Sequence, residues 1–476
     1  MTKESQGAAV RYPVGPERSQ RIHFVGIGGV GMSGIAEVLL ALGYPVSGSD
    51  LKESATVGHL RELGAVVHIG HGAANVAQVD VVVTSSAVAT DNPEVVAARA
   101  AGVPVIPRAE MLAELMRFKR GVAIAGTHGK TTTTSLVATL LYEGGLDPTM
   151  VIGGRLNSIT GTGLLGEGDY LVAEADESDA SFLYLHPQVA VVTGMDPDHM
   201  DTYGGDPERL EAAFRQFLQQ VPFYGLSVLC LDHPRVRAML PQLSKPYVTY
   251  GFDPEADYQA RAVAADGEQM AFECWQRGAE GPLLTAELTL PGRHNVQNAL
   301  AAVAVAHHLG VEPAVIRRGL ARFSGVGRRM QVRGEQAGVL YVDDYGHHPE
   351  EIRVTLAAVR EAWPGRRLIV AFQPHRFTRT RDLLADFGAA FDAADTVLVT
   401  DVYAAGEAPI PGAGGGDLHA RLQAYGHGDA RYVGPLAELP PALASTAAAG
   451  DVVLTLGAGD IGALARELCP AEEASA

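Results

Sequence analysis

Short apolar segments alternate with helical patterns along most of the chain, and many of these segments end in glycine or polar side chains. In the first third they predict strands at residues 21–25, 66–69, 79–84 and 103–106, with another strand ending at Asp50. Helical periodicity between the strands predicts helices that end near residues 42, 63 and 101. Strands that alternate with helices indicate an α/β fold with doubly wound parallel sheets.

The pattern changes further along the chain. Residues 121–125, 169–173 and 189–193 again predict buried strands, whereas residues 227–290 contain short β-type segments with turn signals and little helix. We interpret 227–290 as antiparallel strands appended to the central unit. A glycine-containing linker at residues 323–329 then leads into a third α/β unit. The strands expected in this unit are residues 338–342, 367–372, 396–400 and 451–456.

The strand at 121–125 runs into GTHGK at residues 126–130, followed by four threonines and a helical pattern. A strand, a glycine-rich turn and Lys-Thr at a helix start are typical of a phosphate-binding loop. Small residues let backbone N–H groups surround an anion, and Lys130 adds a positive charge. Thr131 or Thr132 can place a hydroxyl on Mg²⁺. The usual spacing has glycine at 124, where this chain has Ile124, so the loop is a shortened variant.

The first predicted strand runs into GIGGVG at residues 26–31, a G-x-G-x-x-G pattern, and Asp50 follows at about the distance of a Rossmann acidic residue. The pattern indicates a pyrophosphate on the first helix. By itself it fits a dinucleotide cofactor, any other nucleoside diphosphate, or a plain tight turn. Ser85 and Ser86 follow a strand at the same edge of the sheet, so they are candidate substrate contacts.

Two acidic segments follow strands of the central unit. One is EADESD, which begins at Glu174, and the other is DPDHMD at residues 196–201, which contains His199. Carboxylates at a strand end favour a cation, and Mg²⁺ prefers one or two such oxygens with phosphates and water. Either segment alone is equally compatible with a solvated acidic loop. Together with Lys130, they are expected to meet at one edge of the sheet.

Further polar side chains open a helix or follow predicted strands. Asn295 either caps the helix that it opens or contacts adenine, and Arg328 either binds phosphate or belongs to a solvated linker. A cluster in the third unit should converge at strand ends. Its members are Asp343, Tyr345, His347, His348, His375, Arg376 and Arg379.

The chain has 476 residues, enough for two to four domains of roughly 100–200 residues. We expect a Rossmann-like domain at 21–119, an ATP-binding domain at 120–325, a Rossmann-like domain at 326–469, and flexible tails at 1–20 and 470–476. The formal net charge of −18 argues against a nucleic-acid-binding protein. Three separated cysteines, a polar N-terminus and no long apolar run favour a cytoplasmic protein outside the membrane.

Three α/β units are expected, and an ATP-binding unit between two other binding domains suggests a ligase that uses ATP to activate one substrate. Such a reaction needs no cysteine nucleophile. The chain resembles the Mur ligase family from about residue 22 to 468. The resemblance rests on GIGGVGMSGIAE at 26–37, GTHGKTTTTS at 126–135, EADESDASFL at 174–183, DPDHMDTY at 196–203, Asn295 with Asn298, DDYGHHP at 343–349 and QPHRFTRT at 373–380. No lysine occurs between His199 and Pro222, which fits the branch that adds alanine.

The resemblance implies that ATP phosphorylates the lactyl carboxylate of UDP-N-acetylmuramate, and that the amine of L-alanine attacks the acyl phosphate. It implies catalytic roles for Lys130, Glu174, His199, His347 and Arg376. It also implies two metal sites for Mg²⁺, with Mn²⁺ as an alternative: Thr131 and Glu174 hold one ion, and His199 is a ligand of the second. The implied ATP site comprises Gly126, Thr127, His128, Gly129, Lys130, Thr131, Thr132, Asn295, Arg328 and Asp343. The implied UDP-sugar site comprises Gly28, Gly29, Val30, Gly31, Ser49, Asp50, Ser85, Ser86 and Arg108. The implied amino-acid site comprises Tyr345, His347, His348, Arg376 and Arg379.

Under this interpretation the G-x-G-x-x-G pattern binds UDP and not a dinucleotide. Three alternatives stay open at this point: a recycling ligase that joins a whole tripeptide to the same sugar nucleotide, an NAD(P)-dependent oxidoreductase, and a sensor without catalytic activity. The assembly is expected to be a monomer or a homodimer.

Overall fold

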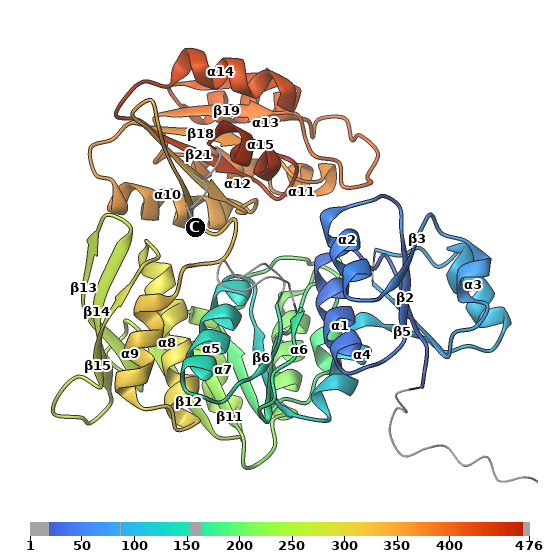
Figure 1. The fold of residues 1–476 in the computed structure, drawn as a ribbon. Helices are drawn as coiled ribbons and strands as arrows, with labels where there is room; N and C mark the ends of the chain where they lie inside the picture. Colours follow the sequence, from blue (N-terminus) through green and yellow to red (C-terminus); the bar gives the residue numbers. More distant parts are fainter. Residues whose placement is uncertain (1–18, 86, 153–162, 470–476) are drawn as a thin grey trace, which may run out of the picture.

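The computed structural model describes residues 19–85, 87–152 and 163–469, and its strands form three sheets in three α/β domains (Figure 1). Ser86, most of the predicted N-terminal tail, the C-terminal tail and the side chain of Val30 lie outside the described residues. No helix among the described residues is long and apolar enough to cross a bilayer.

The N-terminal domain contains a five-stranded parallel sheet of order β3-β2-β1-β4-β5. Its strands are β1 (Ile22–Val25), β2 (Val46–Asp50), β3 (Val66–Ile69), β4 (Val81–Thr84) and β5 (Val105–Pro107). Its helices are α1 (Val30–Ala41), α2 (Ala55–Glu62), η1 (Ala73–Val76), α3 (Pro93–Ala100) and α4 (Arg108–Met116). The strand order reverses at β1, so the glycine-rich turn after β1 lies where open α/β sheets bind ligands.

The central domain contains a ten-stranded sheet of order β15-β14-β13-β12-β11-β10-β6-β9-β7-β8. Its strands are β6 (Arg120–Ala125), β7 (Thr149–Val151), β8 (Gly163–Leu164), β9 (Tyr170–Glu174), β10 (Val189–Val192), β11 (Leu226–Cys230), β12 (Tyr247–Gly251), β13 (Tyr258–Asp266), β14 (Gln269–Gln276) and β15 (Leu284–Leu288). Its helices are α5 (Lys130–Glu143), η2 (Ser181–Tyr184), α6 (Pro207–Gln219), α7 (Pro234–Met239), η3 (Leu240–Gln242), α8 (Arg293–His308) and α9 (Pro313–Arg322).

The interpretation of residues 227–290 as antiparallel strands is wrong for its first part. β11 pairs in parallel with β10, β12 in parallel with β11, and β13 in parallel with β12. Within residues 227–290, the antiparallel pairs are β13 with β14 and β14 with β15. β11 and β12 therefore extend the parallel core, and the antiparallel addition begins at β13, a strand that the sequence pattern had missed.

The C-terminal domain contains a six-stranded sheet of order β16-β17-β21-β18-β19-β20, parallel except for β16. Its strands are β16 (Gln331–Gln336), β17 (Val339–Asp344), β18 (Leu368–Phe372), β19 (Thr396–Thr400), β20 (Ala430–Gly434) and β21 (Val452–Leu456). Its helices are α10 (Pro349–Ala362), α11 (Phe377–Asp382), α12 (Leu384–Ala390), α13 (Gly415–Tyr425), η4 (Leu436–Glu438), α14 (Leu439–Thr446) and α15 (Ile461–Leu468).

The central domain contacts both of the others (Figure 1). α1 of the N-terminal domain packs against β7 and β8. Gly34 and Gly163 meet at this contact so closely that a Cβ on Gly163 would lie 2.2 Å from the Gly34 carbonyl oxygen. The Gly163 N–H also donates to Glu37 Oε2 at 2.7 Å. Two backbones thus touch at the joint between the domains, and there is no room for a Cβ on Gly163.

We expect Gly163→Ala to lower the free energy of unfolding by about 1–3 kcal/mol, because the added methyl group overpacks this joint. Gly58→Ala is the matched control, since Gly58 lies inside α2 and a Cβ there has nothing within 4 Å. That control should be neutral or stabilising by up to about 1 kcal/mol. Urea unfolding followed by circular dichroism measures both variants, and equal midpoints would contradict the expectation.

Candidate active site

The glycine-rich loop lies between the end of β6 at Ala125 and the start of α5 at Lys130. Gly126 and Gly129 have φ angles of 128° and 81°, a region that favours glycine. A Cβ on Gly126 would lie 2.1 Å from Thr193 Oγ1, and one on Gly129 would lie 2.6 Å from Asn298 Oδ1. Both glycines are therefore needed for conformation and for space. The loop leads directly into the helix N-terminus, where the macrodipole favours anions.

The ammonium group of Lys130 is surrounded by oxygen atoms. Its Nζ donates to the Gly126 carbonyl at 2.8 Å and lies 2.8 and 2.7 Å from the two carboxylate oxygens of Glu177, a residue only 3 % exposed. Burial alone would lower the pKa of Lys130, but the carboxylates of Glu177, Asp176 and Glu174 raise it, so the lysine stays charged. The positive charge of the loop is thus neutralised within the protein.

The residues predicted to bind a metal lie around this loop. β9 pairs with β6 so that Glu174 is opposite Ile124, and Thr131 follows the loop lysine directly. His199 follows β10 with a φ of 52°, and its Nε2 lies 3.5 Å from Asp198 Oδ2. Among the described residues no three His, Cys, Asp or Glu side chains converge as a metal site. Because Mg²⁺ takes few protein carboxylates when phosphates and water complete its shell, these donors fit a nucleotide-bound ion.

The glycine-rich turn after β1 contacts two predicted site residues. The Gly28 N–H donates to Asp50 Oδ2 at 2.9 Å. A Cβ on Gly31 would lie 2.2 Å from Arg108 Nη1, so only glycine lets this guanidinium cross the start of α1. Arg108 Nη2 in turn lies 3.2 Å from Asp176 Oδ2 of the central domain. Arg108 therefore links the predicted diphosphate turn to the acidic segment beside the phosphate loop.

Ser49 is fully buried at the end of β2, and its hydroxyl is engaged inside the domain. Its Oγ donates to Glu94 Oε2 at 2.6 Å and lies 2.9 Å from His71 Nδ1, while Asn75 donates to the other Glu94 oxygen. Burial raises the pKa of Glu94, but the ring of His23, with its Nε2 3.5 Å from Glu94 Oε2, and hydrogen bonds from Ser49 and Asn75 lower it to about 2. The contact of Ser49 with a sugar nucleotide stays a prediction.

Aromatic rings line the predicted amino-acid side of the site. The ring of His347 lies 5.5 Å from that of Tyr345 and 5.8 Å from that of His375, which stacks on Tyr403 at 5.4 Å. Burial lowers the pKa of His347 to about 4. Burial, with His347 and Arg379 nearby, lowers the pKa of His375 to about 3. Both imidazoles are therefore neutral at pH 7, beside the permanent charge of Arg379, whose Nη1 lies 3.3 Å from His375 Nδ1.

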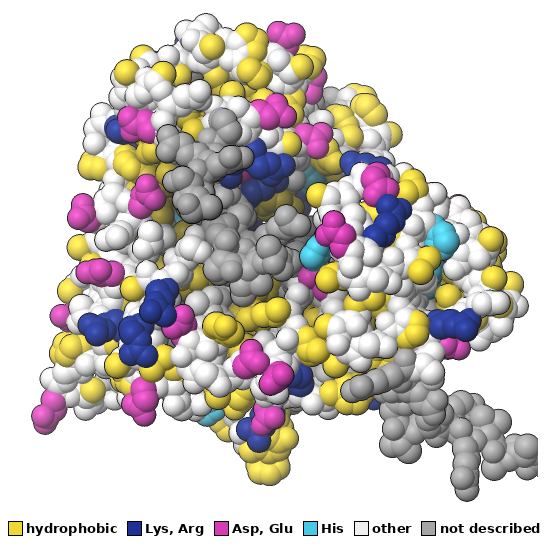
Figure 2. Space-filling view, viewed as in Figure 1, with side chains coloured by type: hydrophobic (Ala, Val, Ile, Leu, Met, Phe, Trp, Pro, Cys, Tyr) yellow, Lys and Arg dark blue, Asp and Glu magenta, His cyan; other side chains and the backbone are white. Residues whose placement is uncertain are grey.

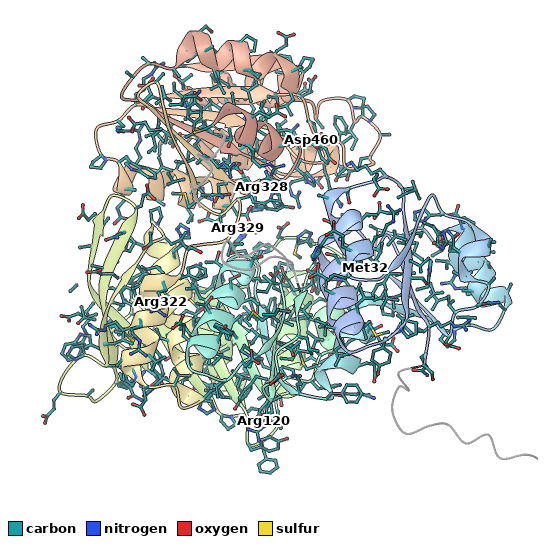
Figure 3. All side chains as sticks on the ribbon, viewed as in Figure 1. Met32, Arg120, Arg322, Arg328, Arg329 and Asp460 are labelled. Carbon is teal, nitrogen blue, oxygen red and sulfur yellow. The ribbon has the colours of Figure 1, made fainter. Side chains whose placement is uncertain are left out.

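Arg328 lies at the junction of the C-terminal and central domains, where Figure 2 shows a group of basic side chains in a hollow and Figure 3 labels Arg328 and Arg329. Its guanidinium donates to the Gly457 carbonyl, has its Nε 3.5 Å from Asp343 Oδ2, and lies 5.1 Å from the Tyr345 ring centroid. Arg328 and Asp343, both expected at the nucleotide, thus contact each other.

Asn295 does not cap α8, because the N-cap residue is Gly292. The Asn295 side chain is buried and donates to the Pro291 carbonyl at 2.7 Å, and it accepts from Asn298 Nδ2 at 3.3 Å. Thr133 of α5 donates to Asn298. The capping interpretation is therefore wrong. Asn295 lies where hydrogen bonds join α5 and α8. A contact between Asn295 and adenine stays a prediction.

Charged groups of the central and C-terminal domains face each other. Burial raises the pKa of Asp198, but His199, His348 and Arg379 lower it more, so groups of both domains lie near this carboxylate. The ring of His128 lies 5.5 Å from that of His348. The structure therefore brings the phosphate loop, the segment that carries His199 and the start of α10 together.

Three carboxylates contact predicted site residues but have no sequence pattern that assigns them a role: Glu177 contacts Lys130, Glu351 contacts His128, and Glu94 contacts Ser49. Glu177 is visible only as one of several carboxylates in EADESD, and no spacing rule marks it as the partner of Lys130. Glu351 follows DDYGHHP at the N3 position of a capping box, which signals only a helix start. Glu94 opens an ordinary amphipathic helix, and nothing in the sequence places it beside Ser49.

Three family models match successive parts of the chain: Mur ligase family, catalytic domain, at residues 21–120, Mur ligase middle domain at 124–306, and Mur ligase, glutamate ligase domain, at 328–459. The chain belongs to the Mur ligase family.

Individual relatives extend over nearly the whole chain. A UDP-N-acetylmuramate–L-alanine ligase from Bordetella avium (strain 197N) is 56 % identical over 461 residues, which are 95 % of this chain and 98 % of that protein. The crystal structure of UDP-N-acetylmuramate–alanine ligase MurC from Thermotoga maritima has a TM-score of 0.81 at 32 % identity and covers 94 % of this chain and 98 % of its own. A murein peptide ligase from Psychrobacter arcticus, with a TM-score of 0.70, 24 % identity and coverage of 94 % and 98 %, shares the fold.

We expect the free energy of unfolding to fall as the pH drops from about 6.5 to 5. Burial lowers the pKa of His294 and of His347 to about 4, and that of His375 to about 3. The unfolded chain, with histidine pKa values near 6.5, therefore binds more protons in this window. Glu351 and Asp196 raise the pKa of His128 against burial, so its stabilisation is complete below about pH 6.5 and does not offset the fall.

Urea unfolding at several pH values tests this dependence. His294→Gln removes one of the partly buried neutral imidazoles and should flatten the slope by up to about 1.4 kcal/mol per pH unit. A variant whose slope equals that of the wild type would contradict the assignment of a neutral, partly buried His294.

Proposed function

We propose that this protein joins L-alanine to the lactyl carboxylate of UDP-N-acetylmuramate with ATP, in the cytoplasmic synthesis of peptidoglycan precursors. The products are UDP-N-acetylmuramoyl-L-alanine, ADP and phosphate. The observation that carries the proposal is the position of the phosphate loop. Arg108, which lies against the glycine-rich turn of the N-terminal domain, contacts Asp176 in the acidic segment beside the loop. On the other side of the loop, His128 faces the start of α10, beside the histidine and arginine cluster. The Bordetella avium relative, named for this reaction, aligns over nearly the full length of both chains.

Lys130 would bind the phosphates of ATP and neutralise charge as the γ-phosphoryl group moves to the carboxylate. To do so, its ammonium must exchange the Glu177 carboxylate for phosphate oxygens. Thr131, Glu174 and His199 are the residues that would hold Mg²⁺, with Mn²⁺ as an alternative. When bound, such an ion supplies neutralisation of the phosphate charge. The glycine-rich turn at the start of α1 would bind the UDP diphosphate through its N–H groups.

The C-terminal domain would bind L-alanine. Arg376 and Arg379 suit the carboxylate, because a guanidinium binds it bidentately. With pKa values of about 4 and 3, His347 and His375 are weak bases, so they suit hydrogen bonding to the amino group better than removal of its proton. Attack of the neutral amine on the acyl phosphate forms the C–N bond in a tetrahedral intermediate. Its collapse breaks the C–O bond to the phosphate, which leaves with the proton lost by nitrogen.

Phosphate release measures this reaction directly. It should require ATP, Mg²⁺, UDP-N-acetylmuramate and L-alanine together, and equal turnover without L-alanine would refute the proposal. Competition between L-alanine and a tripeptide in one assay separates the alanine ligase from the recycling ligase. A fluorescence titration with NADPH that shows no binding removes the oxidoreductase alternative.

Lys130→Ala should lower kcat by about 10²–10³-fold, because it removes a group that stabilises charge in the transition state. Lys245→Ala is the matched control, since Lys245 lies between the central-domain strands β11 and β12, outside the residues that form the predicted site. Steady-state phosphate release gives both values. A sensor without catalysis has no turnover to lose, and equal rates for the two variants would contradict the role of Lys130.

A further inference from the structure

His128 of the phosphate loop contacts the C-terminal domain. His128 Nδ1 lies 3.3 Å from Glu351 Oε1, which belongs to the first turn of α10. The two residues are separated by more than two hundred positions in sequence and come from different domains. Each is mostly buried, with the side chain of His128 24 % exposed and that of Glu351 17 % exposed. This contact is therefore a shielded link between the ATP end and the amino-acid end of the site.

Glu351 uses its two oxygens on the two sides of this link. Oε1 faces His128, while Oε2 accepts the backbone N–H groups of His347 at 3.0 Å and His348 at 3.2 Å. Burial raises the pKa of Glu351, but His347 and His128 lower it well below its usual range, so the carboxylate is charged. One fixed charge thus sets both the position of the loop histidine and the backbone that carries His347 and His348.

His128 has a second anionic neighbour on the central-domain side. Its Nε2 lies 3.8 Å from Asp196 Oδ2, and Asp196 Oδ1 is 3.2 Å from His233 Nε2. The His128 ring therefore lies between a carboxylate of its own domain and one of the C-terminal domain. This arrangement favours one relative placement of the two domains, because moving α10 away leaves Glu351 without its partner in the loop.

We propose that Glu351 is a positioning residue that aligns the amino-acid site with the phosphate loop through His128. The proposal rests on the proposed function, because it assigns the alignment of L-alanine with the acyl phosphate. Glu351 contacts no reacting atom in this role. It fixes the distance between the loop that delivers the phosphoryl group and the backbone that carries His347. Such alignment decides the rate because reacting atoms must approach to about 3–3.5 Å.

Glu351→Gln separates this role from helix capping. Glutamine at N3 still completes a capping box, so the helix start is kept while the charge facing His128 is lost. Glu350→Gln is the matched control, since Glu350 is adjacent and pairs with Arg353 on the surface of the same helix. We expect both variants to keep the melting temperature of the wild type, measured by differential scanning fluorimetry.

In the phosphate-release assay, Glu351→Gln should raise the KM for L-alanine and lower kcat/KM for L-alanine by up to about 10²-fold, as misplaced reactants do. The dissociation constant for ATP, measured by calorimetry, should stay within a few-fold of the wild type. Glu350→Gln should match the wild type in all three quantities. Equal kinetics of the two variants would overturn the proposal, and so would a loss confined to ATP binding.

A double-mutant cycle tests the route through the loop histidine. His128→Gln removes the same contact from the other side, so the double variant should be no slower than the more impaired single variant. Multiplicative losses would overturn the proposal. If Glu351→Gln lowers the melting temperature, His128→Gln alone decides: unchanged kcat/KM for L-alanine would overturn the proposal and a raised KM for L-alanine would support it. Failure of the proposed function is distinguishable, because wild type and Glu350→Gln would then show no alanine-dependent turnover.

Discussion

The structure depends on the neutralisation of one buried charge, the ammonium group of Lys130. Its position at the start of α5 is set by the glycine conformations of the loop, and Glu177 supplies the opposite charge at 2.7 Å. Removing one partner of a buried pair costs about 3–5 kcal/mol, because the other charge is left uncompensated. When no phosphate is bound, a carboxylate must therefore balance the charge of Lys130. Glu177, in the acidic segment after β9, supplies it.

That segment also connects the loop to its neighbours. Asp176 lies beside the Lys130–Glu177 pair and takes the guanidinium of Arg108, which crosses the glycine-rich turn of the N-terminal domain. On the other side, His128 meets Glu351 of the C-terminal domain. The Arg108–Asp176 and His128–Glu351 contacts are ionic or hydrogen-bonded, and each includes a residue in or near the predicted phosphate loop. A change of charge at the loop therefore alters electrostatic interactions with all three domains, since partial burial weakens screening by solvent.

The sequence predicted the parts of the fold in which polar candidate site residues directly follow a short apolar run. The strand–loop–helix unit at Gly126 and the strand ends that carry Glu174 and His199 follow from apolar runs bounded by polar residues. The direction of β11 and β12 could not be predicted, because a short apolar run looks the same in parallel and antiparallel sheets. Glu177 and Glu351 were not assigned roles because their partners are fixed by tertiary packing. Of the two, Glu351 lies more than two hundred residues from His128.

Three predicted site residues have strained backbone conformations. His199, Arg328 and Arg376 have φ angles of 52°, 60° and 71°, which cost non-glycine residues about 1–3 kcal/mol each. All three were predicted site residues, and their surroundings hold two of them firmly: the Arg328 carbonyl accepts from the Tyr345 N–H at 2.8 Å, and the Arg376 N–H donates to the Tyr403 carbonyl at 2.8 Å. A strained backbone persists only where such contacts over-determine it. The hydrogen bonds that hold the strained backbone of Arg328 and Arg376 therefore also fix the positions from which their side chains extend. The positive charges of these two guanidinium groups are placed by the backbone of the C-terminal domain.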